Sequence, residues 1–355
     1  MALSRSPLAP ALLEWFAREG RRDLPWQREP TPYRVWVSEI MLQQTQVATV
    51  IPYYRRFLRV FPEVRSLARA HLDEVLHLWS GLGYYARARN LHRAAQRIVD
   101  VHGGEFPRSF AEVAALPGIG RSTAGAILAL AYGERFAILD GNARRVLARY
   151  FGIAGSIADR AHRERLWELA ARCTPSHSIE AYTQAIMDLG ATLCLRRNPA
   201  CMRCPLTQRC VARRAGRQHE WPEPRRRALR RRRSVFMVVA LNERDEVLLE
   251  RRPERGVWGG LWCLPEFASA RQARTFIRAS FGGAARLKPL DSIDHGFTHF
   301  DLTINPLLAR SACVLPLVQD GSRLWCKLGA PERIGLPAPV AALLANLARD
   351  AAVRD

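Results

Sequence analysis

Four cysteines that fall within 17 consecutive residues constrain the fold of this chain more than any other feature. Cys194, Cys201, Cys204 and Cys210 have the spacing C-x6-C-x2-C-x5-C. In a reducing compartment, thiols so close in the sequence are typical of a metal centre rather than of disulfides. The spacing alone is equally compatible with a [4Fe-4S] cluster and with a tetrahedral zinc site. In either case residues 194–210 must fold as one loop around the metal.

The chain carries a large positive charge, which indicates a polyanionic partner. Its 54 lysines and arginines against 33 aspartates and glutamates give a net charge of +21, and the only lysines are Lys288 and Lys327. The charge is therefore almost entirely guanidinium, whose forked donors suit phosphate oxygens. A biased genome composition would produce the same excess of arginine, so the charge alone does not establish that the partner is a polyanion.

The rest of the composition is that of a soluble globular protein, with 48% hydrophobic and 25% charged residues. No stretch approaches the roughly 18 consecutive apolar residues that a membrane span needs. Pro7, Pro10 and Glu14 interrupt the apolar stretch near the N-terminus, and no secretory signal is legible. We therefore expect no membrane association and a cytoplasmic location.

A change in the period of the hydrophobic residues divides the chain. Residues 1–212 have apolar residues at helical spacing and predict a mostly α-helical region. The runs 235–239 and 246–250 have strand character, which predicts a separate α+β domain over residues 234–355. Residues 213–233 are expected to form a linker, because the segment 211–233 holds ten arginines and only two glutamates. This basic linker either grips a DNA backbone or is simply solvated.

A glycine-containing segment at 116–125 predicts a turn between two helices. Its sequence, Leu-Pro-Gly-Ile-Gly-Arg-Ser-Thr-Ala-Gly, places Gly118 and Gly120 just before a helix. Backbone amides can approach a phosphate closely at such a position, because no Cβ atom obstructs them. Tight turns of this kind also join packed helices that bind nothing.

Two carboxylates stand out from the residues around them. Asp140 ends an apolar run and precedes Gly141 and Asn142, and a helix N-cap is its ordinary explanation. Glu39 lies among apolar residues in a helix expected to begin near Thr31 and Pro32. Burial there would raise its pKa toward the range that suits a general acid. Taken alone, an exposed or paired helical glutamate is the simpler interpretation.

Several segments, in order along the chain, closely resemble the MutY family of adenine DNA glycosylases, in the endonuclease III helix-hairpin-helix superfamily. They are Trp-Val-Ser-Glu-Ile-Met-Leu-Gln-Gln-Thr-Gln-Val at 36–47, Gly-Leu-Gly-Tyr-Tyr-Ala-Arg at 81–87, the glycine segment, Leu-Asp-Gly-Asn at 139–142 and the four cysteines. The resemblance implies a helix-hairpin-helix glycosylase region and a [4Fe-4S] cluster. It also implies a monofunctional base excision repair enzyme, which hydrolyses the N-glycosidic bond of adenine opposite 8-oxoguanine or guanine in duplex DNA.

The resemblance also implies roles for individual residues. Glu39 would protonate adenine at N7 and assist the attacking water, and Asp140 would stabilise or capture the deoxyribose cation; one acid and one anion is the pairing that glycoside cleavage uses. Trp26 and Gln184 would form the adenine pocket. The expected DNA contacts in residues 1–212 are Gln43, Gln44 and Tyr84 around the lesion pair, with Gly118, Gly120, Ser122 and Asn142.

Residues 234–355 resemble the MutT-like, Nudix-type domain of the same family. The R-E-x-x-E-E helix that holds magnesium in hydrolytic Nudix enzymes does not occur in the sequence. We therefore expect this domain to recognise 8-oxoguanine rather than to hydrolyse a nucleotide. The family reads the lesion with a Phe-Ser-His loop, and this chain has Phe297, Thr298 and His299. Thr298 keeps the hydroxyl and adds a methyl group, and an ordinary strand-edge pair is the alternative for Thr298 and His299.

Two other functions are alternatives to adenine excision. An endonuclease III-like glycosylase acting on oxidised pyrimidines needs a Schiff-base lysine in the hairpin, where this chain has Ser122. A non-catalytic, metal-stabilised DNA-binding protein would not need both Glu39 and Asp140. We expect a monomer that binds duplex DNA containing adenine:8-oxoguanine or adenine:guanine pairs, in the cytoplasm and associated with the nucleoid.

Overall fold

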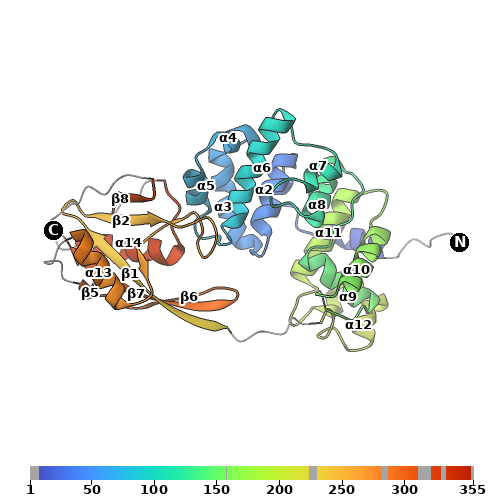
Figure 1. Cartoon of the computed structure of the whole chain (residues 1–355). Coiled ribbons are helices and arrows are strands. Elements are labelled where there is room, and N and C mark those ends of the chain that lie inside the picture. Colours follow the sequence, from blue (N-terminus) through green and yellow to red (C-terminus); the bar gives the residue numbers. More distant parts are fainter. Residues whose placement is uncertain are drawn as a thin grey trace. The chain divides into compact units, whose positions relative to one another are not determined.

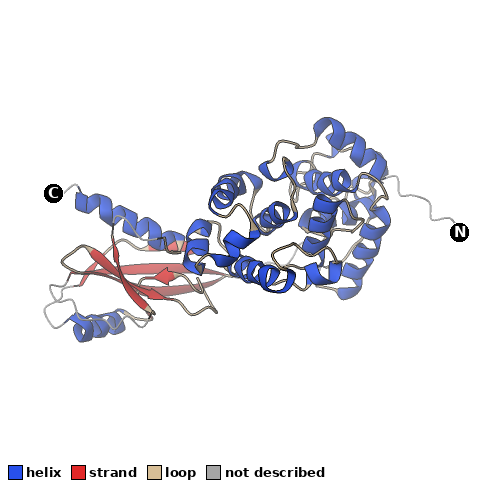
Figure 2. Ribbon diagram, turned by 90° about the horizontal axis from the view of Figure 1, so that it is seen from above, coloured by secondary structure: helices blue, strands red, loops and turns tan. Residues whose placement is uncertain are grey.

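The computed structural model describes residues 8–156, 158–223, 230–281, 287–310, 321–328 and 333–352. It divides into two compact units (Figure 1). The helical unit consists of residues up to 69 together with 90–226, and the sheet unit consists of 70–89 together with 227 onward. All described strands belong to the sheet unit (Figure 2). Among the described residues, no helix has the length and apolar character needed to cross a membrane.

The helical unit is built from α-helices and short 3-10 turns. In chain order they are α1 (Leu8–Glu19), η1 (Pro25–Gln27), α2 (Pro32–Leu42), α3 (Val47–Val60), α4 (Val64–Arg69), α6 (Ala86–His102, whose first turn belongs to the sheet unit), α7 (Phe110–Ala114), α8 (Arg121–Tyr132), α9 (Gly141–Phe151), α10 (Arg160–Cys173), α11 (Ile179–Thr192), η2 (Cys201–Arg203), η3 (Thr207–Arg209) and α12 (Val211–Arg214). As the sequence predicts, Thr31 caps α2 by accepting a hydrogen bond from the Arg34 amide (3.3 Å), and Pro32 occupies the first turn. Helix α2 packs against α3 and α8.

The core beneath the cysteine segment comes from four helices. Leu12 and Trp15 of α1, Leu147 of α9, Leu166 of α10 and Ile186 of α11 are all buried in one cluster. Partly buried cysteines of the 194–210 segment pack against the same cluster. Since α9 begins directly after Asp140, this core connects the cysteine segment to the candidate catalytic carboxylate.

The sheet unit contains one mixed sheet of eight strands. These are β1 (Arg231–Leu241), β2 (Glu246–Arg251), β3 (Trp262–Cys263), β4 (Glu266–Phe267), β5 (Leu287–Pro289), β6 (Ile293–Gly296), β7 (Phe300–Arg310) and β8 (Arg323–Lys327). The main order is β3-β2-β1-β7-β5, while β4, β6 and β8 pair with β1, β7 and β2. Helix α13 (Ala270–Phe281) buries Ala273 and Ile277 against one face of the sheet. The other helices of the unit are α5 (Leu72–Trp79) and α14 (Ala338–Ala352).

Two features of the sheet unit differ from the regions 1–212, 213–233 and 234–355 that the sequence predicts. Helix α5 packs with the strands, through the ion pair between Arg251 and Asp73 (2.8 Å) and through the close approach of Gly335 to Leu76. Strand β1 begins at Arg231, so the last three residues of the expected linker are in the sheet, where they pair with the start of β7. Residues 224–229 of that linker lie outside the described part of the chain.

Candidate active site

Glu39 and Asp140 come from two different elements of the helical unit and lie near each other. Burial raises the pKa of Glu39, on α2, to about 8, and the charge of Asp140 adds to this effect. Asp140 is the N-cap of α9, where its Oδ1 accepts a hydrogen bond from the Ala143 amide (2.8 Å). The arrangement provides a carboxyl group that holds its proton at neutral pH beside a second carboxyl group.

A cavity of about 250 Å³ lies beside α2 in the helical unit. Its lining includes Trp26 and Gln184, the two residues expected to form the adenine pocket, and Ser38, the neighbour of Glu39. Trp26 is buried and meets the ring of Tyr54 edge-on, with 5.4 Å between the ring centroids. Arg22 and Glu180 also line this cavity, and no pattern in the sequence singled them out. The structure thus brings together the predicted pocket residues.

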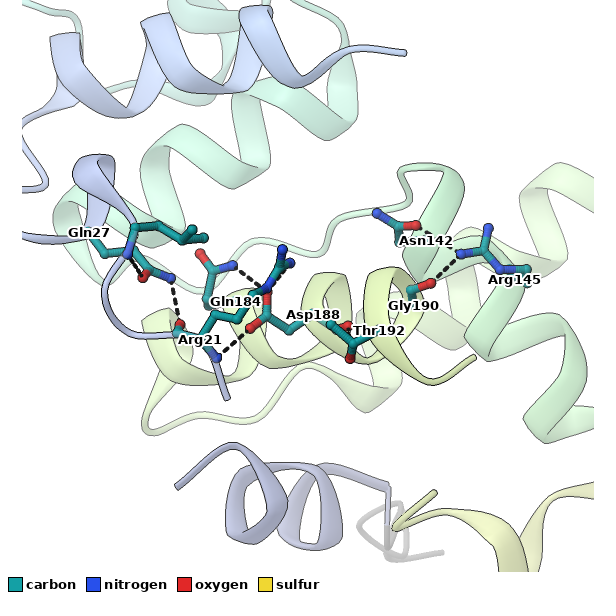
Figure 3. A network of polar contacts seen from close by, with 9 residues as sticks. Arg21, Gln27, Asn142, Arg145, Gln184, Asp188, Gly190 and Thr192 are labelled. Carbon is teal, nitrogen blue, oxygen red and sulfur yellow. Dashed lines mark hydrogen bonds and ion pairs between the residues drawn. The ribbon is translucent and has the colours of Figure 1, made fainter. Parts of the chain in front are cut away.

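The side-chain amide of Gln184 is held by a buried carboxylate (Figure 3). Gln184 Nε2 donates to Asp188 Oδ1 (3.1 Å), one turn further along α11. Asp188 is fully buried and also accepts bonds from the Arg21 guanidinium (2.7 Å) and the Arg21 amide (2.9 Å). Because its amide nitrogen is engaged by Asp188, Gln184 can present its carbonyl oxygen to a hydrogen-bond donor in the cavity.

The glycine segment forms the turn that precedes α8. Gly118 has a φ of +79°, and a Cβ there would lie 2.8 Å from Asn90 Cβ, so only glycine fits without strain. Gly120 is the N-cap of α8 and has no other group within 4 Å of an added Cβ. The free amides at the start of α8 are therefore open to an anion. The hydroxyl of Ser122 accepts a hydrogen bond from the Leu139 amide (3.0 Å), which ties α8 to the residue before Asp140.

Two of the expected lesion-contact residues have unusual backbone conformations. Gln44 and Tyr84 have φ values of +60° and +49°, in the left-handed region that non-glycine residues rarely adopt. Such strain is found most often at binding and catalytic sites. The preceding residue, Gln43, is the C-cap of α2, and its Nε2 donates a long bond to Thr123 Oγ1 (3.5 Å).

In the sheet unit, Tyr84 lies next to the predicted reader of 8-oxoguanine. The hydroxyl oxygens of Tyr84 and Thr298 are 2.7 Å apart. Thr298 and His299 are exposed at the turn between β6 and β7, which the Phe297 amide closes by donating to the Phe300 carbonyl (2.9 Å). The structure therefore brings together residues separated by more than 200 positions.

The four cysteines of the 194–210 segment are partly buried and close enough to influence each other's ionisation. Burial raises the pKa of Cys204 to about 12; the charges of the other three thiols add to this, and a hydrogen bond from the Leu206 backbone opposes it. The buried Arg149 donates to Cys194 Sγ (3.3 Å) and to the Leu195 carbonyl (2.7 Å). Four crowded thiols beside a cation fit a cationic metal centre, which would displace their protons. In the described part of the chain, no group of histidine, cysteine and acidic side chains is already arranged to hold a metal ion.

Arg145 connects the cysteine segment to the start of α9. Figure 3 shows its side chain beside Asn142 and Gly190. Its guanidinium donates to the Cys194 carbonyl (2.7 Å), the Gly141 carbonyl (3.0 Å) and Asn142 Oδ1 (2.9 Å). A Cβ at Gly190 would lie 2.5 Å from Asn142 Cβ, so α11 and α9 approach closely here. Asn142, expected to contact DNA, thus also has a structural partner.

Comparison with known proteins identifies the family. Residues 37–172 match the model of the HhH-GPD superfamily base excision DNA repair proteins, and residues 236–346 match the NUDIX domain. The adenine DNA glycosylase of Buchnera aphidicola subsp. Acyrthosiphon pisum is 38% identical, over 96% of this chain and 97% of that protein. The chain belongs to the adenine DNA glycosylase family. The human adenine DNA glycosylase is 33% identical, over 82% of this chain and 65% of that protein.

Solved structures of DNA glycosylases share the fold over 59% of this chain. A thermostable thymine-DNA glycosylase has 28% identity and a TM-score of 0.54, over 59% of this chain and 97% of that one. Endonuclease III in a non-covalent DNA complex has 21% identity and a TM-score of 0.51, over 59% and 94%, and shows the shared fold. The predicted fold class is confirmed. The prediction that the chain is a base excision repair enzyme that hydrolyses N-glycosidic bonds is confirmed as well. An endonuclease III-like activity on oxidised pyrimidines is not favoured.

Proposed function

We propose that this glycosylase removes adenine opposite 8-oxoguanine, and more weakly opposite guanine, from duplex DNA. The observation that carries the proposal is the raised pKa of Glu39, about 8, beside Asp140 and next to the cavity that Trp26 and Gln184 line. A general acid must hold a proton at the working pH, and Glu39 does so at neutrality. The names of the relatives support adenine as the base.

Catalysis begins when the target nucleotide leaves the helix, which costs a few kcal/mol of stacking and pairing. The base enters the cavity beside Trp26, where the carbonyl oxygen of Gln184 accepts a hydrogen bond from the exocyclic amine of adenine. Glu39 transfers its proton to N7. As the N-glycosidic bond breaks, the bonding electron pair leaves with the base, and the sugar becomes an oxocarbenium-like cation that the Asp140 carboxylate stabilises. Glu39, now ionised, accepts a proton from the water that attacks the sugar.

We propose that Cys194, Cys201, Cys204 and Cys210 hold a [4Fe-4S] cluster. Four thiol donors are the usual ligand set of such clusters. When bound, the cluster neutralises the crowded thiolates and fixes the fold of the segment, as metal ligation generally does. The exposed guanidinium groups of this segment then form a basic surface for phosphates: Arg196, Arg197, Arg203 and Arg209.

Further residues are proposed to take part in recognition of the damaged pair. Tyr84, Thr298 and His299 are proposed to contact 8-oxoguanine. The open amides after Gly118 and Gly120, with Ser122 and Asn142, are proposed to bind the backbone near the extruded nucleotide. Gln43 and Gln44 are proposed to fill the space that the base leaves. We further propose that the enzyme acts as a monomer, in the cytoplasm and in association with the nucleoid.

A single-turnover excision assay tests the proposed function. Duplexes with adenine opposite 8-oxoguanine, guanine and thymine should be cleaved at rates that fall in this order. The product should be an intact abasic strand until alkali or heat is applied, because no lysine precedes Lys288 and the hairpin carries Ser122. Equal rates on all three duplexes would refute the proposal.

A further inference from the structure

We propose that Arg231 and Arg233, at the start of strand β1, bind phosphates of the DNA strand that carries 8-oxoguanine. This proposal rests on the proposed function, since the arginines lie beside the predicted lesion reader in the sheet unit. It assigns a defined role to two of the arginines in the basic run that joins the two regions of the sequence.

The register of the sheet places Arg231 and Arg233 on one face. Strands β1 and β7 run parallel, with Arg231 opposite Phe300 and Arg233 opposite Leu302, and β6 adds His295 opposite Leu302. Side chains of paired residues point to the same face of a sheet, and successive residues alternate between faces. The two arginines therefore share a face with Phe300 and His295, while Arg232 lies on the opposite face.

On the opposite face of the sheet, carboxylates lie near the arginines. Arg232 is opposite Asp301, and Arg230 forms an ion pair with the same carboxylate (3.1 Å). Asp294 of β6, opposite Thr303, adds a second carboxylate near this end of the sheet. Arg231 and Arg233 are exposed, and among the described residues neither has an ion-pair partner. The charge available to an external anion is thus concentrated on one face.

The same face leads directly to the lesion reader. Phe300 follows His299 and stacks on Phe297 with 4.5 Å between ring centroids, and Arg233 lies 5.5 Å from the Phe300 ring. Phe297 also packs on Trp258 (5.4 Å). These aromatic contacts fix the reader turn relative to the start of β1. Any DNA strand held at Thr298 therefore passes close to the two guanidinium groups.

The spacing of the two arginines suits successive phosphates of one strand. Residues two apart in a β-strand are separated by about 7 Å. Successive phosphates of one strand rise about 3.4 Å along the helix axis and also rotate around it, so their separation is about as large as that of the two arginines. Guanidinium groups on long side chains can adjust to this rise and bond each phosphate through two N–H donors. A strand, unlike a solvated loop, also holds the two side chains on the same side.

The test compares neighbouring arginines by the salt dependence of DNA binding. Full-length Arg231→Gln, Arg233→Gln and the double variant are measured against Arg232→Gln, the matched control on the opposite face. The ligand is a duplex with a non-hydrolysable adenosine analogue opposite 8-oxoguanine or guanine. Each lost phosphate contact lowers the slope of log affinity against log salt by about 0.9, so the double variant should lose about 1.8. Arg232→Gln should lose less than a third of one contact, and Arg233→Lys, which keeps the charge, should retain the slope.

The loss should be the same opposite 8-oxoguanine and opposite guanine, because phosphates carry no base identity. No loss in the double variant would show that the run is merely solvated, and an equal loss in Arg232→Gln would overturn the assignment of phosphate binding to one face of the sheet. A loss confined to 8-oxoguanine duplexes would overturn the phosphate assignment in favour of base contacts. Excision by the wild type is measured in parallel: if it fails, the proposed function fails, while slopes on an undamaged duplex still decide whether the arginines bind phosphates.

Discussion

Replacing Glu39 with glutamine should stabilise the fold while it abolishes excision. Burial, with the charge of Asp140 as the smaller cause, raises the pKa of Glu39 from its ordinary 4.5 to about 8. Between these two pH values the folded chain holds a proton that the unfolded chain has released. Stability therefore falls as pH rises through this window, by about 1.4 kcal/mol for each pH unit. Compared with a side chain that stays neutral, Glu39 lowers the free energy of unfolding by about 3 kcal/mol at pH 7. Above pH 8 this loss of stability levels off at about 5 kcal/mol.

Glutamine has nearly the same shape and does not ionise, so this pH-dependent loss of stability disappears in Glu39→Gln. The variant should be more stable than the wild type by about 3 kcal/mol at pH 7 and by under about 1 kcal/mol at pH 5. For a domain of this size, 1 kcal/mol shifts the melting temperature by about 2–4 °C. Thermal melting followed by circular dichroism should therefore show a rise of about 6–12 °C at pH 7 and of at most about 2–4 °C at pH 5.

Glu14→Gln is the matched control, because Glu14 is an exposed helical glutamate that pairs with Arg18 at 3.4 Å. Surface pairs of this kind contribute at most about 1 kcal/mol. A gain in Glu39→Gln that is equal at pH 5 and pH 7 would contradict the reasoning, as would a loss at pH 7. Either result would mean that the carboxyl group is not held in its protonated form, and the acid assignment would lose its basis.

Four further predictions concern other parts of the molecule. The single-turnover rate of the wild type should fall as pH rises through about 8, because Glu39 then loses its proton; a flat profile from pH 6 to 10 would contradict this. Asp188→Asn should slow excision roughly tenfold or more, because asparagine has one acceptor oxygen and no charge and cannot accept from Gln184, the Arg21 guanidinium and the Arg21 backbone amide together; a buried polar group left unpaired costs about 1–3 kcal/mol. Cys201→Ser should fold poorly and bind DNA weakly, and metal analysis of the wild type should find four irons with sulfide rather than one zinc. Thr298→Ser should be nearly neutral, whereas Thr298→Ala with His299→Ala should weaken binding to 8-oxoguanine duplexes selectively, by about 1–3 kcal/mol per lost contact.

Local features of the fold followed from the sequence, and distant pairings did not. The cap at Thr31 and the turn at Gly118 are set by a few neighbouring residues, and the structure has both where the pattern predicts them. The pairing of Arg21 with Asp188 spans 167 positions, and hydrophobic periodicity reports which face of a helix is buried but not its partner.

Two other features could not be predicted from the sequence, because they also depend on contacts between distant residues. The association of α5 with the strands depends on individual contacts such as that between Asp73 and Arg251. The start of β1 at Arg231 lies in a run of charge that favours a linker, and pairing with β7 overrides that preference. The proximity of Glu39 to Asp140 could be expected only through the family resemblance, because nothing in the spacing of 101 residues requires it.

The position of Asp140 as a helix cap has a consequence for how inactive forms of this enzyme arise. Asparagine is as good an N-cap as aspartate, so Asp140→Asn can keep the hydrogen bond to Ala143 and the start of α9. Quality control in the cell acts on unfolded chains and would not recognise such a variant. A mutation here would leave a folded protein that lacks the carboxylate proposed to stabilise the sugar cation. Loss of function at this residue would therefore come with a normal amount of folded protein, unlike the loss caused by a variant that fails to fold.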